Sequence, residues 1–161
     1  MSDPLPVELL LRTWFGYMVA GVWGLLWGSF CNVVIHRVPL GQSVVLPASH
    51  CPSCQQPLSW YDTLPLLSWL ALRGRCRRCK ARISVRYPLI ELLSCGLALL
   101  TFRSVLVEPE LPVAMTLARF LLRYGLSAVL LALSAIDLAH KRIPDRITYP
   151  AIPLAFVLGR L

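Results

Sequence analysis

Residues Trp14–Ile35 read WFGYMVAGVWGLLWGSFCNVVI, a run of 22 positions without a charged side chain. An α-helix needs about 20 predominantly apolar residues to cross the hydrocarbon core of a bilayer. The run therefore predicts a transmembrane helix. A secretory signal peptide is the alternative, but the run lacks a basic segment before it and a clear small-residue cleavage site. We expect the helix to be retained in the mature protein.

The rest of the chain is also more apolar than soluble domains usually are. Hydrophobic residues make up 57% of the 161 residues, and the mean hydropathy is +0.64. Pro88–Val107 and Phe120–Ile136 are candidates for two more spans. Another apolar run starts at Ile147 and stops at Leu161, too soon for a comfortable crossing, so we expect the chain to be truncated. The expected fold class is an all-α polytopic membrane protein with three to four transmembrane helices.

Positive charge is gathered in one loop between the first two spans. Between His36 and Tyr87 the chain has eight arginine or lysine residues and one acid, Asp62. Cytoplasmic loops of membrane proteins carry an excess of such residues, so this loop is predicted to be cytoplasmic. The N-terminus then lies outside, residues 103–119 form an outer loop, and residues 137–146 return to the cytoplasm. The basic face suits anionic lipid headgroups. Nucleic acid is not an expected partner, because no groove-reading pattern accompanies the charge.

The same loop contains two cysteine pairs, Cys51-Pro-Ser-Cys54 and Cys76-Arg-Arg-Cys79. Structural zinc takes four thiolate or imidazole ligands in a tetrahedron, and each pair can supply two thiolates. The 21 residues between the pairs slightly exceed the usual spacing of about 15–20, so the loop must carry structure of its own, which Trp60–Leu72 can supply. Two disulfides or four unrelated thiols are the alternatives, but a reducing cytoplasm favours metal.

Three units follow from these patterns. Residues 1–36 are the first transmembrane helix, residues 37–87 are the cytoplasmic basic zinc loop, and residues 88–161 contain the remaining transmembrane helices. Long helices are not expected in the loop, because proline interrupts them, and bound metal would stabilise so small a subdomain.

In the first span, Gly24-x-x-x-Gly28 matches a helix-packing motif of membrane proteins. Cys31 and Cys95 lie in apolar segments and are expected to fill the core.

Two acids follow the third span. Asp137 stands at the membrane boundary, where an ionisable residue is a functional candidate and a solvated helix end is the alternative. Asp145 follows Pro144, and an N-cap or first-turn acid explains it well. Aspartic proteolysis needs two carboxylates that share one proton. A continuous helix would separate these two by about 12 Å. Without a turn at Ile143-Pro144, Asp137 must therefore pair with an acid elsewhere.

Several segments stand in an order that is characteristic of one family. They are GSFCNVVIHRVP (28–39), the two cysteine pairs, WYDTLPLLSW (60–69), RGRCRRC (73–79), ISVRYP (83–88) with Glu91, and DLAHKRIPDRIT (137–148). Together they resemble bacterial type IV prepilin peptidases. The resemblance implies a polytopic inner-membrane aspartic protease that cuts the basic leader of type IV prepilins and type II secretion pseudopilins after a glycine. Many members also methylate the new N-terminus with S-adenosylmethionine.

The resemblance also implies roles for particular residues. Asp137 matches the first catalytic aspartate and Asp145 a supporting acid of the same motif, within the N-terminal part of the peptidase domain. The four cysteines match the zinc-binding motif. The family's other catalytic aspartate stands in a Gly-x-Gly-Asp segment, which this chain does not contain. Two hypotheses follow. The first is a membrane peptidase and methyltransferase, which as this chain alone should not cleave peptide bonds unless Asp145 substitutes for the missing acid or a second polypeptide supplies it. The second is a catalytically incomplete zinc module, a scaffold or partial paralogue in pilus or secretion assembly.

Glu91 is the candidate for substrate binding. Prepilin leaders are usually basic, so the basic loop is better suited to lipid phosphates or to the carboxylate of the methyl donor. Glu91 is an acid just inside the second span, near the side predicted to be cytoplasmic. A salt bridge to Arg82 or Arg86, or an ordinary helix-start acid, is the alternative.

Overall fold

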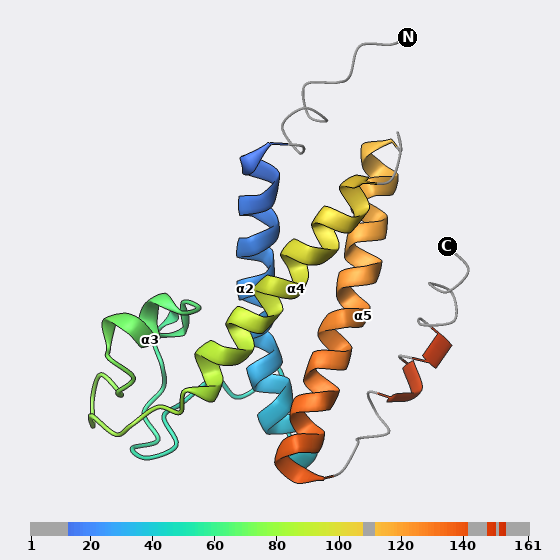
Figure 1. Ribbon diagram of the computed structural model, residues 1–161. Coiled ribbons are helices and arrows are strands. Elements are labelled where there is room, and N and C mark those ends of the chain that lie inside the picture. Colours follow the sequence, from blue (N-terminus) through green and yellow to red (C-terminus); the bar gives the residue numbers. More distant parts are fainter. Residues whose placement is uncertain (1–12, 108–111, 142–147, 151, 154–161) are drawn as a thin grey trace.

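Three long helices form the body of the molecule (Figure 1). The computed structural model describes residues 13–107, 112–141, 148–150 and 152–153. Helices α2 (Trp14–Arg37), α4 (Arg86–Val107) and α5 (Val113–His140) are all long and apolar enough to cross a membrane. The described residues contain no strand. The predicted all-α polytopic fold is therefore confirmed, while the fourth apolar run lies mostly outside the described residues.

The connection between the second and third spans is shorter than predicted. We expected an outer loop over residues 103–119, but α4 includes Arg103 and continues to Val107, and α5 begins at Val113 and includes Arg119. The prediction ended each span at a charged residue. A helix can continue past an arginine near the membrane surface, because the long side chain reaches the headgroups while its stem stays among apolar groups.

The bundle places small residues inside and large apolar residues outside. The buried side of α2 carries glycine and alanine, at Gly16, Ala20, Gly21, Gly24 and Gly28. Many large apolar side chains are exposed on the outer surface, among them Val22, Leu26, Phe30, Leu92, Leu100, Leu121 and Leu130. Lipid tails are as apolar as leucine, so membrane helices associate through close packing of small residues. This distribution suits a bilayer and would be unfavourable in water.

Helix α4 crosses α2 at the two glycines of the predicted packing motif. A Cβ atom at Gly24 would lie 2.7 Å from both Cβ of Ala98 and Cα of Cys95. A Cβ atom at Gly28 would lie 2.7 Å from Cα of Glu91. Only hydrogen fits at both positions, so the predicted role of Gly24-x-x-x-Gly28 is confirmed.

Helix α5 packs against this pair through aromatic and hydroxyl groups. The rings of Phe102 and Phe120 meet edge to face with centroids 5.6 Å apart, and Phe120 stacks on Tyr124 at 5.8 Å. The hydroxyl of Ser94 donates to the carbonyl of Gly24 at 2.8 Å and lies 2.8 Å from the hydroxyl of Tyr124. Because serine has a single hydroxyl hydrogen, Tyr124 is the donor in the second bond. One side chain thus joins all three helices.

The two cysteines of the spans have packing positions. Cys31 is buried in the core of the bundle, and its Sγ lies 3.9 Å from the carbonyl oxygen of Ala128. Cys95 is half-buried and faces Gly21, whose Cβ would lie 3.6 Å from the sulfur atom. The predicted core position of Cys31 is confirmed, and Cys95 lines the contact between α2 and α4.

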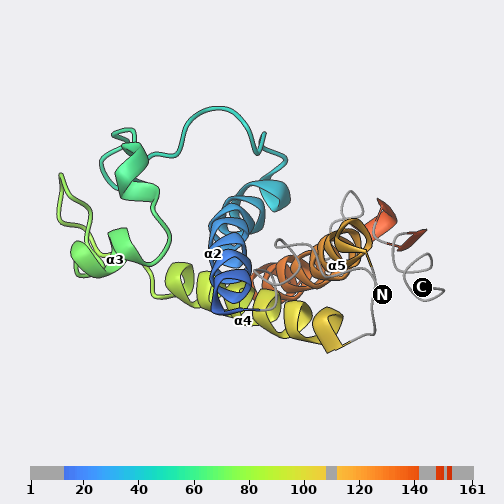
Figure 2. The ribbon, with the colours of Figure 1, turned by 90° about the horizontal axis from the view of Figure 1, so that it is seen from above.

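The segment between α2 and α4 forms a loop subdomain that extends to one side of the bundle (Figure 2). Its regular pieces are short: η1 (Val38–Leu40), η2 (Trp60–Thr63) and α3 (Leu67–Ala71). The prediction that this proline-containing segment lacks long helices is confirmed.

Candidate metal centre and membrane-boundary acids

The first cysteine pair lies in a tight turn closed by backbone hydrogen bonds. The N–H of Gln55 donates to the carbonyl of Cys51 at 2.8 Å, and the N–H of Cys51 donates to the carbonyl of Gln56 at 3.0 Å. His50 and Pro57 form an antiparallel bridge at the base of the turn. Gln55 has a φ of 57°. This left-handed residue reverses the chain immediately after the second cysteine.

The second pair repeats this construction 25 positions later in the sequence. The N–H of Lys80 donates to the carbonyl of Cys76 at 3.0 Å, and the N–H of Cys76 donates to the carbonyl of Ala81 at 2.8 Å. Arg75 and Arg82 form the bridge, and Lys80 has a φ of 61°. The two turns therefore have the same hydrogen-bond pattern, and each presents two sulfur atoms.

The four sulfur atoms converge. The Sγ atoms of Cys51, Cys54, Cys76 and Cys79 all lie within 4.8 Å of one another, and those of Cys51 and Cys79 are 3.8 Å apart. A tetrahedron with Zn–S bonds of about 2.3 Å has sulfur atoms about 3.8 Å apart. All four cysteines are free thiols, so the disulfide alternative is not the arrangement adopted. The donor set and its spacing fit a tetrathiolate zinc site.

The backbone around the cluster changes the acidity of two thiols in opposite directions. A hydrogen bond from the backbone N–H of Cys54 lowers the pKa of Cys51 to about 6, despite the opposing effect of burial. At Cys79, the backbone N–H of Ala81 lowers the pKa, but burial and the neighbouring thiols outweigh it and raise the pKa to about 11. Zinc binds thiolates, so Cys51 is the ligand most ready to bind, and metal must displace the proton of Cys79.

Glu91 connects the loop subdomain to the bundle. The residue is buried in the second turn of α4, and its Oε2 accepts a hydrogen bond of 2.8 Å from the backbone N–H of Leu66, directly before α3. Within the described part of the chain, Glu91 forms no ion pair with Arg82 or Arg86. The salt-bridge alternative is therefore wrong, and the carboxylate instead holds the start of a loop helix.

Two polar residues at the end of α2 organise the same region and were not singled out from the sequence. Arg37 is buried, and its guanidinium donates to the carbonyls of Ser43 at 3.0 Å and Pro47 at 2.8 Å. The amide Nδ2 of Asn32 donates to the carbonyl of Tyr87 at 3.0 Å. A polar amide within an apolar run was the available signal, because such groups need a partner when buried.

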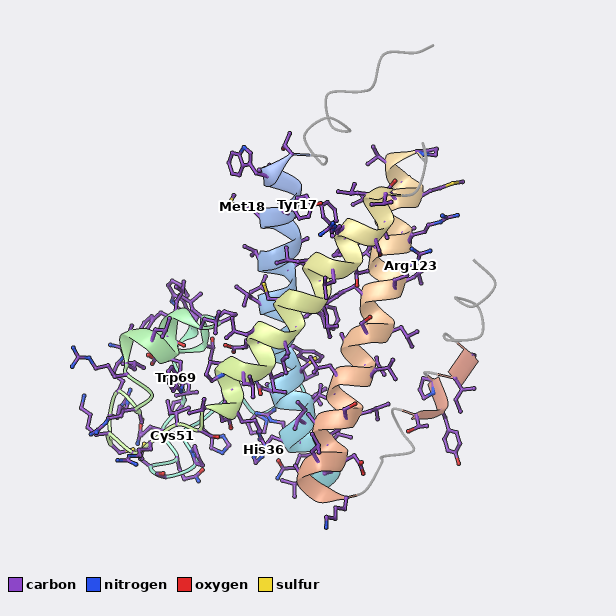
Figure 3. All side chains as sticks on the ribbon, viewed as in Figure 1. Tyr17, Met18, His36, Cys51, Trp69 and Arg123 are labelled. Atoms are coloured by element: carbon purple, nitrogen blue, oxygen red, sulfur yellow. The ribbon has the colours of Figure 1, made fainter. Side chains whose placement is uncertain are left out.

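Asp137 lies in the last turn of α5. Its side chain is exposed, next to the fully buried Ile136, and its carbonyl oxygen accepts from the N–H of Lys141 at 2.7 Å. Helices α2 and α5 both end at the lower end of the bundle, where Figure 3 labels His36. Asp137 therefore lies at the end of the bundle from which the loop subdomain departs. Asp145 lies outside the described residues.

The family comparison matches the part of the chain that contains this loop. Residues 22–105 match the Bacterial Peptidase A24 N-terminal domain. The chain belongs to the bacterial prepilin peptidase family. The segment shared with the prepilin peptidase family's N-terminal domain includes the four clustered cysteines and Glu91, and it ends before Asp137.

Curated members of the prepilin peptidase family extend the similarity along the chain. A prepilin leader peptidase/N-methyltransferase of Myxococcus xanthus is 49% identical over 86% of this chain and 40% of its own length. A type 4 prepilin-like proteins leader peptide-processing enzyme of Escherichia coli is 45% identical, over 81% of the chain and 52% of its own length. A prepilin leader peptidase/N-methyltransferase of Stutzerimonas stutzeri is 36% identical, over 96% of the chain and 58% of its own length.

The chain spans about half the length of the curated relatives it matches, from 40% of the Myxococcus xanthus protein to 58% of the Stutzerimonas stutzeri protein. No solved structure matches the chain.

Proposed function

We propose that the chain takes part in prepilin processing as a membrane aspartic endopeptidase, removing the basic leader of type IV prepilins or type II secretion pseudopilins after glycine. We further propose that the new N-terminus is methylated with S-adenosylmethionine. The observation that carries the proposal is membership of a family whose curated members are named prepilin leader peptidase/N-methyltransferase. The proposed location is the bacterial inner membrane, with the basic loop in the cytoplasm.

Asp137 is the proposed catalytic acid. Its carboxylate is exposed at the end of a transmembrane helix, where it can reach a peptide at the membrane surface. In an aspartic protease one carboxylate takes a proton from water while the second carboxyl protonates the peptide carbonyl. Asp137 therefore requires a second acid. Asp145 is the supporting candidate within the chain.

The four-cysteine cluster is proposed to bind zinc and to order the loop rather than to cut peptide bonds. Four thiolates fill a tetrahedral zinc ion, which leaves no open position for a substrate or an activated water. The cytoplasmic side would keep the thiols reduced and available to metal.

Glu91 was predicted to bind the basic leader, and that role stays a proposal. Glu91 is 7% exposed, and its carboxylate already accepts a hydrogen bond from the backbone N–H of Leu66. These contacts favour a positioning role, in which Glu91 holds α3 against the bundle. A leader-binding role would require a negative charge, whereas a positioning role requires only an acceptor.

The proposed peptidase activity is tested by incubating membranes that contain the product of the complete reading frame with a prepilin. We expect cleavage to be lost in Asp137→Asn and kept in the control Asp62→Asn, where an acceptor for the Arg77 guanidinium remains. Cleavage that survives Asp137→Asn would contradict the assignment. If the unsubstituted product of the complete reading frame is stably expressed with bound zinc but cleaves nothing, the scaffold or partial-paralogue hypothesis is favoured.

A further inference from the structure

The loop subdomain carries an apolar face that nothing among the described residues covers. Leu67 and Leu70 are three residues apart in α3, so they lie on one side of this helix. Leu67 is 66% exposed and Leu70 is 62% exposed. Trp60, in η2, is 75% exposed. Exposed apolar side chains that cluster in this way indicate an interaction surface.

The opposite side of α3 is fixed against the second cysteine turn. The Nε1 of Trp69 donates to the carbonyl of Ile83 at 3.3 Å. The Trp69 ring also covers Gly74, where a Cβ atom would lie 2.9 Å from the ring. Because Trp69 holds the helix by its inner face, Leu67 and Leu70 cannot turn inward without breaking this contact.

The hydrogen bond between Leu66 and Glu91 places α3 beside the transmembrane helices. Glu91 lies five residues beyond the start of α4 at Arg86, which corresponds to about 7 Å along the helix axis. It packs on Gly28, nine residues before the end of α2 at Arg37, or about 13 Å along that axis. The start of α3 is therefore level with the interior of both spans.

The figures show the same arrangement. In Figure 1 the loop subdomain lies beside the lower half of the bundle, with α3 at its upper edge, and Figure 2 confirms that it is displaced sideways. In Figure 3 the label of Cys51 is near the level of His36, whereas Trp69 lies farther up the bundle. The metal cluster thus lies toward the helix ends, and α3 lies toward the membrane interior.

Basic side chains adjoin the apolar face on the side of the metal cluster. A hollow beside the end of α3 is lined by Leu72, Arg73, Arg75, Cys76 and Lys80. Three of these five residues are cationic, which complements the phosphates of anionic phospholipids. An apolar face with aromatic residues above a basic region is the pattern of segments that lie in a membrane interface.

We propose that Trp60–Ala71 is embedded in the bilayer leaflet adjoining the basic loop. Leu67 and Leu70 then lie among the acyl chains, and the basic hollow binds the phosphates of anionic phospholipids. The segment has 12 residues, too few to cross a bilayer, so it enters and leaves on one side. This inference rests on the three transmembrane spans and is independent of peptidase activity. It gives the subdomain a third attachment to the membrane, in addition to α2 and α4.

Photo-crosslinking from defined positions tests the proposal. The full chain is reconstituted in vesicles of phosphatidylglycerol and phosphatidylethanolamine, with a photoreactive leucine analogue at position 67 or 70. Position 53, an exposed serine in the first cysteine turn, is the control. Adducts are identified by mass spectrometry. We expect acyl-chain adducts at 67 and 70, severalfold above those at 53. Equal lipid labelling at all three positions, or crosslinks at 67 to a second copy of the chain instead of lipid, would overturn the proposal.

A second measurement uses the native side chain. Trp60 fluorescence is isolated as the difference between the unsubstituted protein and Trp60→Phe in the same vesicles. We expect this difference signal to be quenched by phospholipids that carry a nitroxide near the headgroup and to be protected from aqueous iodide. Quenching by iodide without quenching by the nitroxide lipid would show a water-exposed indole and contradict the proposal.

Discussion

The carboxylate of Glu91 accepts a hydrogen bond of 2.8 Å from the backbone N–H of Leu66, 25 residues earlier in the chain. This bond joins a transmembrane helix to the loop that carries the metal cluster. Leu66 has a φ of 58°, which costs a residue with a side chain about 1–3 kcal/mol. Such a conformation persists when surrounding contacts hold it, and the Glu91 carboxylate is one of them.

Glu91→Ala should loosen the loop, whereas Glu91→Gln should not. Glutamine keeps an oxygen that can accept from Leu66, while alanine leaves the N–H without this partner at a cost of about 1–3 kcal/mol. Limited proteolysis of the loop in lipid vesicles measures the difference. We expect faster cleavage in Glu91→Ala alone. If the negative charge itself binds the leader, both variants will instead raise the KM for prepilin equally.

Alanine at the helix crossing should destabilise the bundle. Gly24→Ala and Gly28→Ala each place a methyl group 2.7 Å from atoms of α4, so we expect a loss of about 1–3 kcal/mol in the free energy of unfolding. Gly96 is the matched control, because a Cβ atom there meets nothing within 4 Å. Thermal unfolding in detergent micelles should show lower stability for the first two variants only. Equal effects at all three positions would contradict close packing at Gly24 and Gly28 as the cause.

Replacing Ser94 should reduce the stability of the bundle more than replacing its partner Tyr124. Ser94→Ala removes the bond to the Gly24 carbonyl and leaves the Tyr124 hydroxyl without this acceptor, whereas Tyr124→Phe leaves the bond to Gly24 intact. Interhelical hydrogen bonds in membranes contribute about 0.6 kcal/mol on average. We therefore expect Ser94→Ala to reduce stability more than Tyr124→Phe. The double variant should lose less than the sum of the two. An additive result would mean that the hydroxyl groups are not coupled.

Zinc binding to the metal-free protein should release fewer protons than there are cysteine ligands. The pKa of Cys51 lies at about 6, so this thiol is already ionised at neutral pH, while Cys79, at about 11, keeps its proton. We expect release of fewer than four protons per zinc at neutral pH, measured by calorimetry in buffers of different ionisation enthalpy. Release of four would contradict the lowered pKa of Cys51. Cys95→Ser, outside the cluster, should leave the value unchanged.

The same pKa shift predicts how the metal-free loop responds to pH. The folded pKa of Cys51, about 6, is below its ordinary value of 9.0. Its contribution to stability is therefore complete above about pH 9 and is lost as the pH falls through about 6. The raised pKa of Cys79 acts in the opposite sense and opposes folding as the pH rises from about 9 to about 11. Protease resistance of the chelated protein should accordingly decrease as the pH falls from about 9 to about 6, and also as the pH rises from about 9 to about 11.

Adding a chelator to the zinc-bound protein should increase proteolysis between residues 37 and 87 and leave the spans protected. The loop has only short helices to hold it, whereas the bundle packs without the cluster. Mass spectrometry under native conditions should show the loss of one zinc ion. Unchanged proteolysis after complete metal loss would show that the loop does not depend on the metal.

The sequence alone determined the apolar spans, the glycine packing motif and the two cysteine turns. Each depends on residues close together in the chain, where hydropathy, helical spacing and ligand spacing act locally. Only the tertiary structure decided that Glu91 meets Leu66, that Ser94 bonds both Gly24 and Tyr124, and which face of α3 is left exposed. These contacts join residues 25, 70 and 30 positions apart. They depend on how the helices cross, and crossing is set by the packing of whole surfaces, which no local pattern specifies.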